Sequence, residues 1–541
     1  MTPERTPGPC GVDNMAGNTT LLELQATGFR LRKTHEKSRN GCLRCKQQRK
    51  KCDELRPSCS RCTKRMYICR YQNHSTNHSS DPSPLSDGRP ASADEERPHL
   101  DTHTPGTLDT IELSLLSHYL THTSRTIPVD DLDLYALSVG VPNLAFTSEV
   151  VMSSLLALAA ACKSHDIAKP AHALPDPQGL MDIRNLLALA ERHHQASLRH
   201  IQATMQNSDS YDHVLANAAL MVLYASASHS IRVHLATAAK KCRQQLLNEL
   251  LPQHSQWISF TRAAHTASTA ILNSLMAAAD TSSMMLDAPS KLSNPFPCST
   301  AGLSPEDGPS ENTKRVFLPL VASTFNRALK SLCRRAELTT ALLKRSELLA
   351  ADYLQLQACL ETMSVLERCA CAALSTSERS KSAEPPRYQP ISCGELSRVS
   401  PWVAKYMISV TSMESPQILR RIIMSFLNKA PAEYLNIVQS VLDSPSAKAR
   451  AENWMTRDSS GTEVPLLNAT HLLAMDIFAH WLVLVMLLDG VWWIGDIGEW
   501  ELGQVVSLMK TQDLPSQSAD IGQTWWPETM YLVKRELTPS P

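Results

Sequence analysis

Six cysteines near the start of the chain have the types and spacing of metal ligands. They form two near-copies of Cys-x2-Cys-x6-Cys joined by six residues: Cys42, Cys45, Cys52, Cys59, Cys62 and Cys69. Thiolates bind Zn²⁺, which takes four ligands in a tetrahedron, so two ions need eight bonds. Six thiolates supply eight bonds only if two of them bridge. The symmetry of the halves makes Cys42 and Cys59 the bridges, with Cys45 and Cys52 completing one site and Cys62 and Cys69 the other.

The cysteine unit is too small to form an apolar core, so metal binding must supply most of its folding free energy. Asp53, Glu54 and Pro57 fit a turn between the halves. A disulfide framework is an alternative for six cysteines. However, residues 1–20 lack the apolar core of a secretory signal, which favours a reducing compartment and therefore metal-bound thiolates.

The charge of the chain is concentrated around these cysteines. Residues 30–70, called the head below, hold 15 Lys and Arg against three acidic residues. The other 500 residues hold 38 basic and 50 acidic ones, so a net charge of zero hides a head of +12 and a remainder of −12. This asymmetry predicts a polyanion as the partner of the head. A zinc module that only scaffolds protein contacts, the rival interpretation, would not need such charge.

Each half of the cysteine unit is expected to form a short helix that begins at its Cys-x2-Cys, the first running from about Leu43 to Lys50. The segment from Arg39 to Tyr71 resembles the fungal Zn(2)Cys(6) binuclear cluster family of transcription factors. The likeness lies in the six spacings, the basic run before Cys52, the proline before Cys59 and the Cys-x-Tyr ending. It covers about 6% of the chain.

The resemblance implies that the end of the first helix enters the major groove of double-stranded DNA and reads a CGG-type triplet. Arg and Lys donate to guanine O6 and N7, while Gln, which stands where the family commonly has a basic residue, also pairs with adenine. The expected base-reading residues are Lys46, Gln48, Arg49, Lys50 and Lys51. The expected phosphate contacts are Arg44, Arg61, Lys64 and Arg65, with Lys46 serving either role. The basic run 30–51 could also serve as a nuclear import signal.

The rest of the chain divides by composition. Residues 1–38 are expected to be a disordered basic tail, 39–71 the DNA-binding unit, 72–107 a Ser-, Asp- and Pro-rich disordered linker, and 108–541, called the body below, an all-α regulatory domain. Apolar periodicity predicts helices at about 180–206, 211–227, 230–251, 257–279, 314–346, 349–375, 416–428, 431–443 and 466–489. The linker has no heptad pattern, so the protein binds DNA as a monomer or dimerises through the body.

Two patches of the body resemble the regulatory domain of the sterol-uptake-control type of Zn(2)Cys(6) regulators: Leu113 to Cys162, and the tryptophan-rich C-terminal segments. The resemblance implies a helical bundle that could hold a small apolar effector. Six tryptophans lie within 46 residues: Trp481, Trp492, Trp493, Trp500, Trp525 and Trp526. They fit either core packing or a ligand pocket. The twelve uncharged residues Ile477–Leu488 are too few to span a bilayer, which predicts a buried helix.

No enzyme motif is found in the chain. It has no phosphate-binding loop, nucleophile elbow, His-Glu-x-x-His or dinucleotide fingerprint. His193 and His194 are adjacent on a helix and diverge, whereas Asp476 and His480, four residues apart, either pair or face solvent. The sequence predicts a nuclear, zinc-dependent transcription activator that controls a metabolic or secondary-metabolite gene cluster. The alternatives are a protein-binding co-regulator without DNA contact and a sterol- or lipid-responsive regulator.

Overall fold

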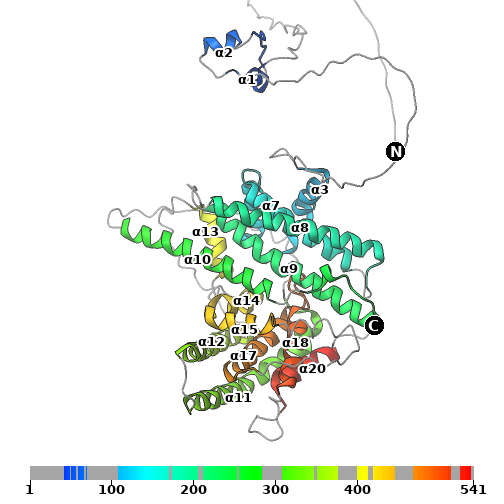
Figure 1. The fold of residues 1–541 in the computed structure, drawn as a ribbon, viewed down its shortest axis with the longest axis vertical. Coiled ribbons are helices and arrows are strands. Elements are labelled where there is room, and N and C mark those ends of the chain that lie inside the picture. Colours follow the sequence, from blue (N-terminus) through cyan, green and yellow to red (C-terminus); the bar gives the residue numbers. More distant parts are fainter. Residues whose placement is uncertain are drawn as a thin grey trace, which may run out of the picture. The chain divides into compact units, whose positions relative to one another are not determined.

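The chain divides into two compact units, Met1–Leu100 and Asp101–Pro541, which are described separately (Figure 1). The computed structural model describes residues 42–48, 50–55, 59–65, 69, 108–169, 174–204, 211–252, 255–282, 308–345, 350–375, 399–411, 418–444, 467–512 and 524–537. The tail expected at 1–38 and the linker expected at 72–107 lie outside these residues, as does Arg49. Across the described residues every regular element is a helix, which confirms the all-α expectation for the body.

The N-terminal half of the body is a layer of long helices. Its elements are α3 (Thr110–His118), η1 (Tyr119–Thr123), α4 (Ser124–Thr126), α5 (Asp131–Tyr135), η2 (Ala136–Gly140), α6 (Val141–Ala145), α7 (Glu149–Ala168), α8 (Pro177–Thr204), α9 (Asp212–Cys242), η3 (Asn248–Leu250) and α10 (Gln256–Ser282). α7 packs against α8 and α9, and α9 packs against α10 (Figure 1). α3 begins with a capping box in which Asp109 and Glu112 each accept the other's backbone N–H.

The C-terminal half of the body surrounds one buried helix, α17. Its elements are η4 (Thr313–Phe317), α11 (Leu318–Arg345), α12 (Ala350–Ser375), α13 (Pro401–Thr411), α14 (Leu419–Lys429), α15 (Ala432–Leu442), α17 (Ala469–Val485), η5 (Met486–Leu488), α18 (Ile497–Thr511) and α20 (Trp526–Leu537). α17 contacts α11, α12, α14, α15, α18 and α20, which lie around it in Figure 1. Every residue from Leu473 to Val485 is buried, as expected of a helix that is apolar all round.

Trp481 lies at the centre of this packing. Its ring is stacked on Phe426 of α14 with a centroid separation of 5.1 Å and on Trp257 of α10 at 6.2 Å. Its indole N–H donates to the carbonyl of Ile423 at 2.9 Å, so the one polar atom of the side chain is satisfied. Core packing is therefore the role of this tryptophan.

The helix predictions agree with the structure in most places and differ in two. The helices expected at 211–227 and 230–251 are one helix, α9, which ends at Cys242 where Arg243 adopts a left-handed conformation (φ 55°). The polar residues at this junction, Ser228, His229 and Ser230, stay helical because their side chains find partners: His229 contacts Glu501 at 2.8 Å, and Ser230 donates to the carbonyl of Trp492. The helices α13, α18 and α20 were not predicted.

Three helices in the described part of the body are long and apolar enough to cross a membrane by length and composition: α7, α9 and the run Ala469–Leu488. The prediction that 477–488 is too short to span a bilayer is therefore wrong on length, because the helical run that contains it begins at Ala469 and has 20 residues. The most apolar windows of these helices are 67%, 94% and 89% buried inside the protein, respectively. Burial in a helical core accounts for their composition as fully as a bilayer would.

Candidate metal centre and DNA-binding surface

Each half of the cysteine unit forms one short helix directly after its first cysteine. α1 (Leu43–Gln47) follows Cys42, and α2 (Ser60–Lys64) follows Cys59. The expectation that the first helix continues to about Lys50 is wrong. The backbone turns after Gln47, and the N–H of Lys50 donates to the carbonyl of Cys45 at 3.0 Å, which leads the chain back to Cys52.

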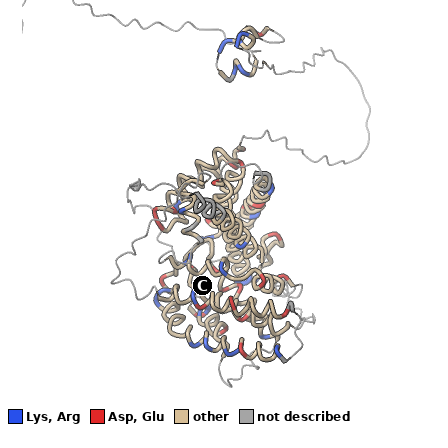
Figure 2. The backbone as a smooth tube through the Cα atoms, turned by 90° about the vertical axis from the view of Figure 1, so that its left-hand side faces the viewer, with Lys and Arg blue, Asp and Glu red and all other residues tan. Residues whose placement is uncertain are grey.

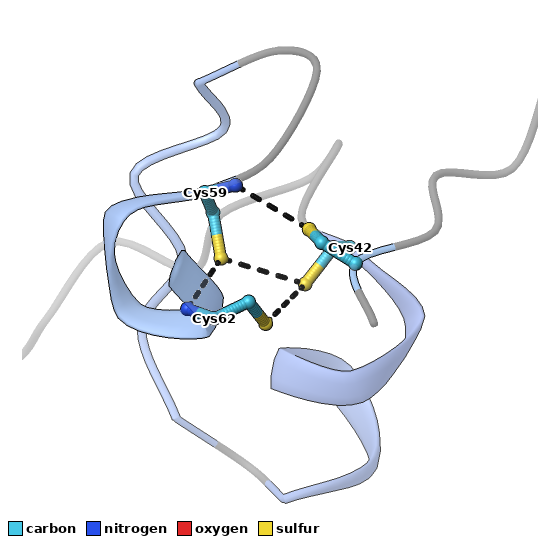
Figure 3. Close-up of side chains that lie close together, drawn as sticks. Cys42, Cys59 and Cys62 are labelled. Atoms are coloured by element: carbon cyan, nitrogen blue, oxygen red, sulfur yellow. Dashed lines mark hydrogen bonds between the residues drawn. The ribbon is translucent and has the colours of Figure 1, made fainter. Parts of the chain in front are cut away.

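The sulfur atoms of the unit gather into two groups of four. One group is Cys42, Cys45, Cys52 and Cys59, and the other is Cys42, Cys59, Cys62 and Cys69. These are the memberships expected from the symmetry of the two halves, and Cys42 and Cys59 belong to both groups. Figure 3 shows the sulfur atoms of Cys42, Cys59 and Cys62 converging between the two helices. None of these six cysteines forms a disulfide, so the disulfide alternative does not describe this unit.

The separations of the sulfur atoms fit a shared tetrahedral centre. The Sγ atoms of Cys42 and Cys59 are 3.8 Å apart, and the pairs Cys42–Cys62 and Cys45–Cys59 have the same separation. Zn–S bonds of about 2.3 Å in a regular tetrahedron place neighbouring sulfurs about 3.8 Å apart. The donor set therefore fits two zinc ions, with the thiols of Cys42 and Cys59 placed between them.

Backbone hydrogen bonds repeat in the two halves. The N–H of Cys42 donates to the Sγ of Cys52 at 3.4 Å, and the N–H of Cys59 donates to the Sγ of Cys69 at 3.3 Å. Between the halves, the Asp53 carboxylate accepts the N–H of Ser60 at 3.0 Å and so caps α2. Glu54 adopts a left-handed conformation (φ 57°), which makes the sharp turn expected in this segment.

The thiolate form of the clustered cysteines needs positive charge close to the sulfur atoms. Burial and the neighbouring thiols raise the pKa of Cys45, and they raise the pKa of Cys62 to about 12. Without a cation these side chains would hold their protons at neutral pH. Bound Zn²⁺ supplies the positive charge that keeps such a group of sulfurs in the thiolate form.

The basic residues of the head lie at its surface. Lys46 is exposed in the last turn of α1, and Gln48, Lys50 and Lys51 are exposed in the segment that follows. Among the expected phosphate contacts, Arg44, Lys64 and Arg65 are exposed and Arg61 is half-buried. The basic segments of the head are drawn in blue in Figure 2. The exposed cations therefore surround a centre in which five of the six cysteines are buried, and the unit can present them to phosphate and base edges.

In the body, Asp476 and His480 pair with each other and do not face solvent. Both are buried, and their side chains lie 3.3 Å apart at Nδ1 and Oδ1. The same carboxylate accepts from Arg335 of α11 at 2.6 Å and from the indole N–H of Trp525 at 2.8 Å. Burial alone would raise the pKa of Asp476, but Arg335 and His480 hold it well below its usual range. The contacts of Asp476 with Arg335 and Trp525, which join three segments of the chain, were not predicted.

The body also contains a cavity of about 110 Å³ between α9, α10, α13 and α14. Its wall includes Val222, His265, Met407, Arg421 and Trp493. Trp493 is the one member of the tryptophan cluster that contributes to this wall. Burial lowers the pKa of His265 to about 4, so this imidazole is neutral at physiological pH.

Comparison with known domains finds one match within each unit. Residues 40–78 match the fungal Zn(2)-Cys(6) binuclear cluster domain, and residues 114–306 match the fungal specific transcription factor domain. The first domain binds two zinc ions, in agreement with the two groups of thiols. In these two regions the chain is similar to fungal Zn(2)-Cys(6) transcription factors.

Individual relatives agree with this assignment. The chain is 34% identical over 181 residues to the Zn(2)-C6 fungal-type transcription factor afumD of Aspergillus fumigatus, which is 33% of this chain and 44% of the relative. It is 60% identical over 40 residues to Sterol uptake control protein 2 of Candida albicans (7% of this chain, 6% of the relative). It is 45% identical over 49 residues to Sterol uptake control protein 2 of Saccharomyces cerevisiae (9% and 5%).

The matches cover less than half the length of each of these relatives. The two sterol uptake control proteins match over segments too short to extend across the helical body. No solved structure matches the chain.

Proposed function

We propose that the chain is a nuclear, zinc-dependent regulator that reads CGG-type triplets and controls transcription by RNA polymerase II, acting as an activator of a metabolic or secondary-metabolite gene cluster. Residues 39–71 bind DNA, 1–38 and 72–107 are tail and linker, and 108–541 form the regulatory domain. The observation that carries the proposal is the pair of overlapping four-thiol groups directly beside exposed basic residues. In this proposal all six cysteines are ligands, with Cys42 and Cys59 as bridges.

DNA contact divides into two roles in this proposal. The residues at and after the end of α1 read bases: Lys46, Gln48, Arg49, Lys50 and Lys51. Arg44, Arg61, Lys64 and Arg65 contact phosphates and position the head on the duplex. Two observations support the division: α1 ends at Gln47, and α2 carries Lys64 in its last turn, on the other half of the unit.

Gel shifts with the full chain test DNA binding directly. A duplex that contains CGG should be retarded, and a zinc chelator should abolish the shift, because the head folds only around its metal. The rival class, a protein-binding co-regulator, predicts no retardation of any duplex at moderate salt. Selection of preferred sites from random DNA would then give the half-site spacing, and sedimentation of the full chain would show whether the body dimerises.

Two substitutions separate base reading from positioning. Arg49→Ala should weaken binding to the CGG duplex by about 1–3 kcal/mol more than binding to a scrambled duplex. Lys64→Ala should weaken both by similar amounts and lower the salt dependence of binding by about one unit of slope. Titrations of both variants on both duplexes, at several salt concentrations, measure the difference. Equal losses for the two variants on the two duplexes would contradict the assignment.

A small apolar effector is a second candidate function of the body, favoured by the cavity beside Met407 and Trp493. An engineered apolar cavity of about 150 Å³ takes up benzene, so one of about 110 Å³ can accept a ring or a branched alkyl group. The branched tail of a sterol or one ring of an aromatic polyketide would fill a cavity of this size, so a panel of these compounds should contain one that raises the melting temperature of the full chain. Ala264 of α10 also lines the cavity, so filling it by Ala264→Leu should remove that increase. No increase with any compound would contradict the proposal.

A further inference from the structure

Two histidines and an aspartate of the body converge on one point away from the cysteine unit. His118 ends α3, His122 lies in the π-helical segment η1, and Asp166 lies near the end of α7. Their ligand atoms all lie within 4.8 Å of one another. The two imidazoles are four residues apart, and their ring centroids are 5.2 Å apart with an interplanar angle of 63°.

The distances suit a metal ion held by both imidazoles and one carboxylate oxygen. The Oδ2 atom of Asp166 lies 3.1 Å from Nε2 of His118 and 3.4 Å from Nε2 of His122. Zinc bonds of about 2.0–2.1 Å to nitrogen and oxygen in a tetrahedron place neighbouring ligand atoms about 3.3–3.4 Å apart. Small side-chain movements would therefore bring all three atoms to bonding distance of one ion.

One of the ligands is already oriented by a second hydrogen bond. Nδ1 of His118 lies 3.0 Å from the hydroxyl oxygen of Thr123, a buried residue at the end of η1. When Nδ1–H donates to this hydroxyl, the lone pair of Nε2 is left to bind a metal. Outer hydrogen bonds of this kind fix the tautomer and the ring plane of metal-bound histidines. π-helical turns are frequent at functional sites, and η1 places His122 and Thr123 beside the ring of His118.

The cluster is also accessible from solvent. The side chains of His118, His122 and Asp166 are 20%, 48% and 38% exposed. An ion can therefore enter, and a fourth position stays open to water or to another ligand. Open sites with three protein ligands are the usual arrangement of non-structural zinc.

We propose that His118, His122 and Asp166 form a binding site for a divalent transition-metal ion of the Zn²⁺ class, separate from the two ions of the cysteine unit. An ion held there cross-links the first helical segment of the body, α3 with η1, to α7. Two imidazoles and one carboxylate favour Zn²⁺ and its first-row neighbours over Mg²⁺ or Ca²⁺, which prefer oxygen ligands only.

Metal content of the full chain tests the site. Equilibrium dialysis against Zn²⁺ at some tens of micromolar should give three ions per chain. This concentration is needed because an exposed site with three protein ligands is expected to bind more weakly than a closed thiolate site. A thiol-specific mercurial should then release two ions and leave the third bound. This step distinguishes the two proposals, because failure of the cysteine unit would remove the released pair and not the retained ion.

Variants assign the third ion to these residues. His122→Gln, a change of the most exposed of the three ligands, and Asp166→Asn should each reduce the content from three ions to two, with both thiol-bound ions kept. His213→Gln, a change of a half-buried histidine on α9, is the matched control and should keep three. Two ions in the unmodified chain, or three in the His122 and Asp166 variants, would overturn the proposal. Circular dichroism of each variant checks that the helical body is intact.

Discussion

Replacing Cys42 by serine should remove both zinc ions from the cysteine unit and abolish specific DNA binding. Cys42 belongs to both groups of four sulfurs, and a serine hydroxyl is a poor substitute for a bridging thiolate. Structural zinc supplies an apparent 10–16 kcal/mol or so to modules of this size, so a unit without it is expected to be unfolded. Specific affinity should fall to the non-specific level, a loss of roughly 10³-fold or more.

The contrast with a terminal ligand makes the experiment informative. Cys45 belongs to one group only, so Cys45→Ser should leave the four thiolates of the other site in place. Cys371→Ser, an exposed cysteine of the body, is the control and should keep both ions. Metal analysis before and after treatment with a mercurial, together with gel shifts, measures the outcome. If Cys42→Ser keeps as much thiol-bound zinc as Cys45→Ser, Cys42 does not bridge.

The cysteine unit could be predicted in detail because its structure depends on local spacing. The separations of two and six residues between cysteines determine which sulfurs can meet, and the repeat of the pattern made Cys42 and Cys59 equivalent. What spacing did not show is where α1 ends. That point depends on the carbonyl of Cys45 accepting from Lys50 and on the sulfur of Cys52 accepting from Cys42.

The sequence predicted most helices of the body, but it did not predict which distant side chains meet between them. Apolar periodicity located α8, α10, α11 and α12 because each buries one face. The same signal failed at α9, where the buried His229 pairs with Glu501 of α18, and at α20, which begins at Trp526. Asp476, Arg335 and Trp525 are distant in the sequence, and only the packing of α11 and α20 on α17 brings them together.

The net positive charge of the chain is concentrated in the head, and the net negative charge lies in the remainder. The head of +12 contains a metal unit with exposed cations. The remainder of −12 includes a body with buried ion pairs, such as Asp133 between Arg420 and Arg421. A neutral whole limits long-range attraction to polyanions, whereas the head keeps a high local positive charge. Association with non-specific DNA should therefore depend on the head and fall steeply with salt.

Removal of the buried carboxylate at Asp476 should cost the body about 3–5 kcal/mol of unfolding free energy. The side chain is 3% exposed and accepts hydrogen bonds from Arg335 and Trp525, with the imidazole of His480 at 3.3 Å. In Asp476→Ala the guanidinium of Arg335 and the indole N–H lose their partner in a largely water-free site. Asp476→Asn keeps the volume and one acceptor, so it should cost less.

The effect should depend on pH with a definite sign. The pKa of Asp476 in the folded protein lies well below the value of about 3.9 for an unfolded aspartate. The carboxylate therefore stabilises the fold at pH above 4, and this stabilisation is lost as the pH falls through the folded-state pKa. The difference in unfolding free energy between the unmodified chain and Asp476→Ala should therefore shrink as the pH falls below 4.

Urea unfolding followed by tryptophan fluorescence measures this difference in the body alone, because all nine tryptophans lie beyond residue 250. Glu311→Ala is the control, since it removes a carboxylate that is 80% exposed and pairs with Lys314, and it should cost less than about 1 kcal/mol. The double variant with Arg335→Ala should lose less than the sum of the single losses, because both changes break one interaction. Additive losses, or a cost of Asp476→Ala no larger than that of Glu311→Ala, would show that the ion pair does not hold α11 and α20 to α17.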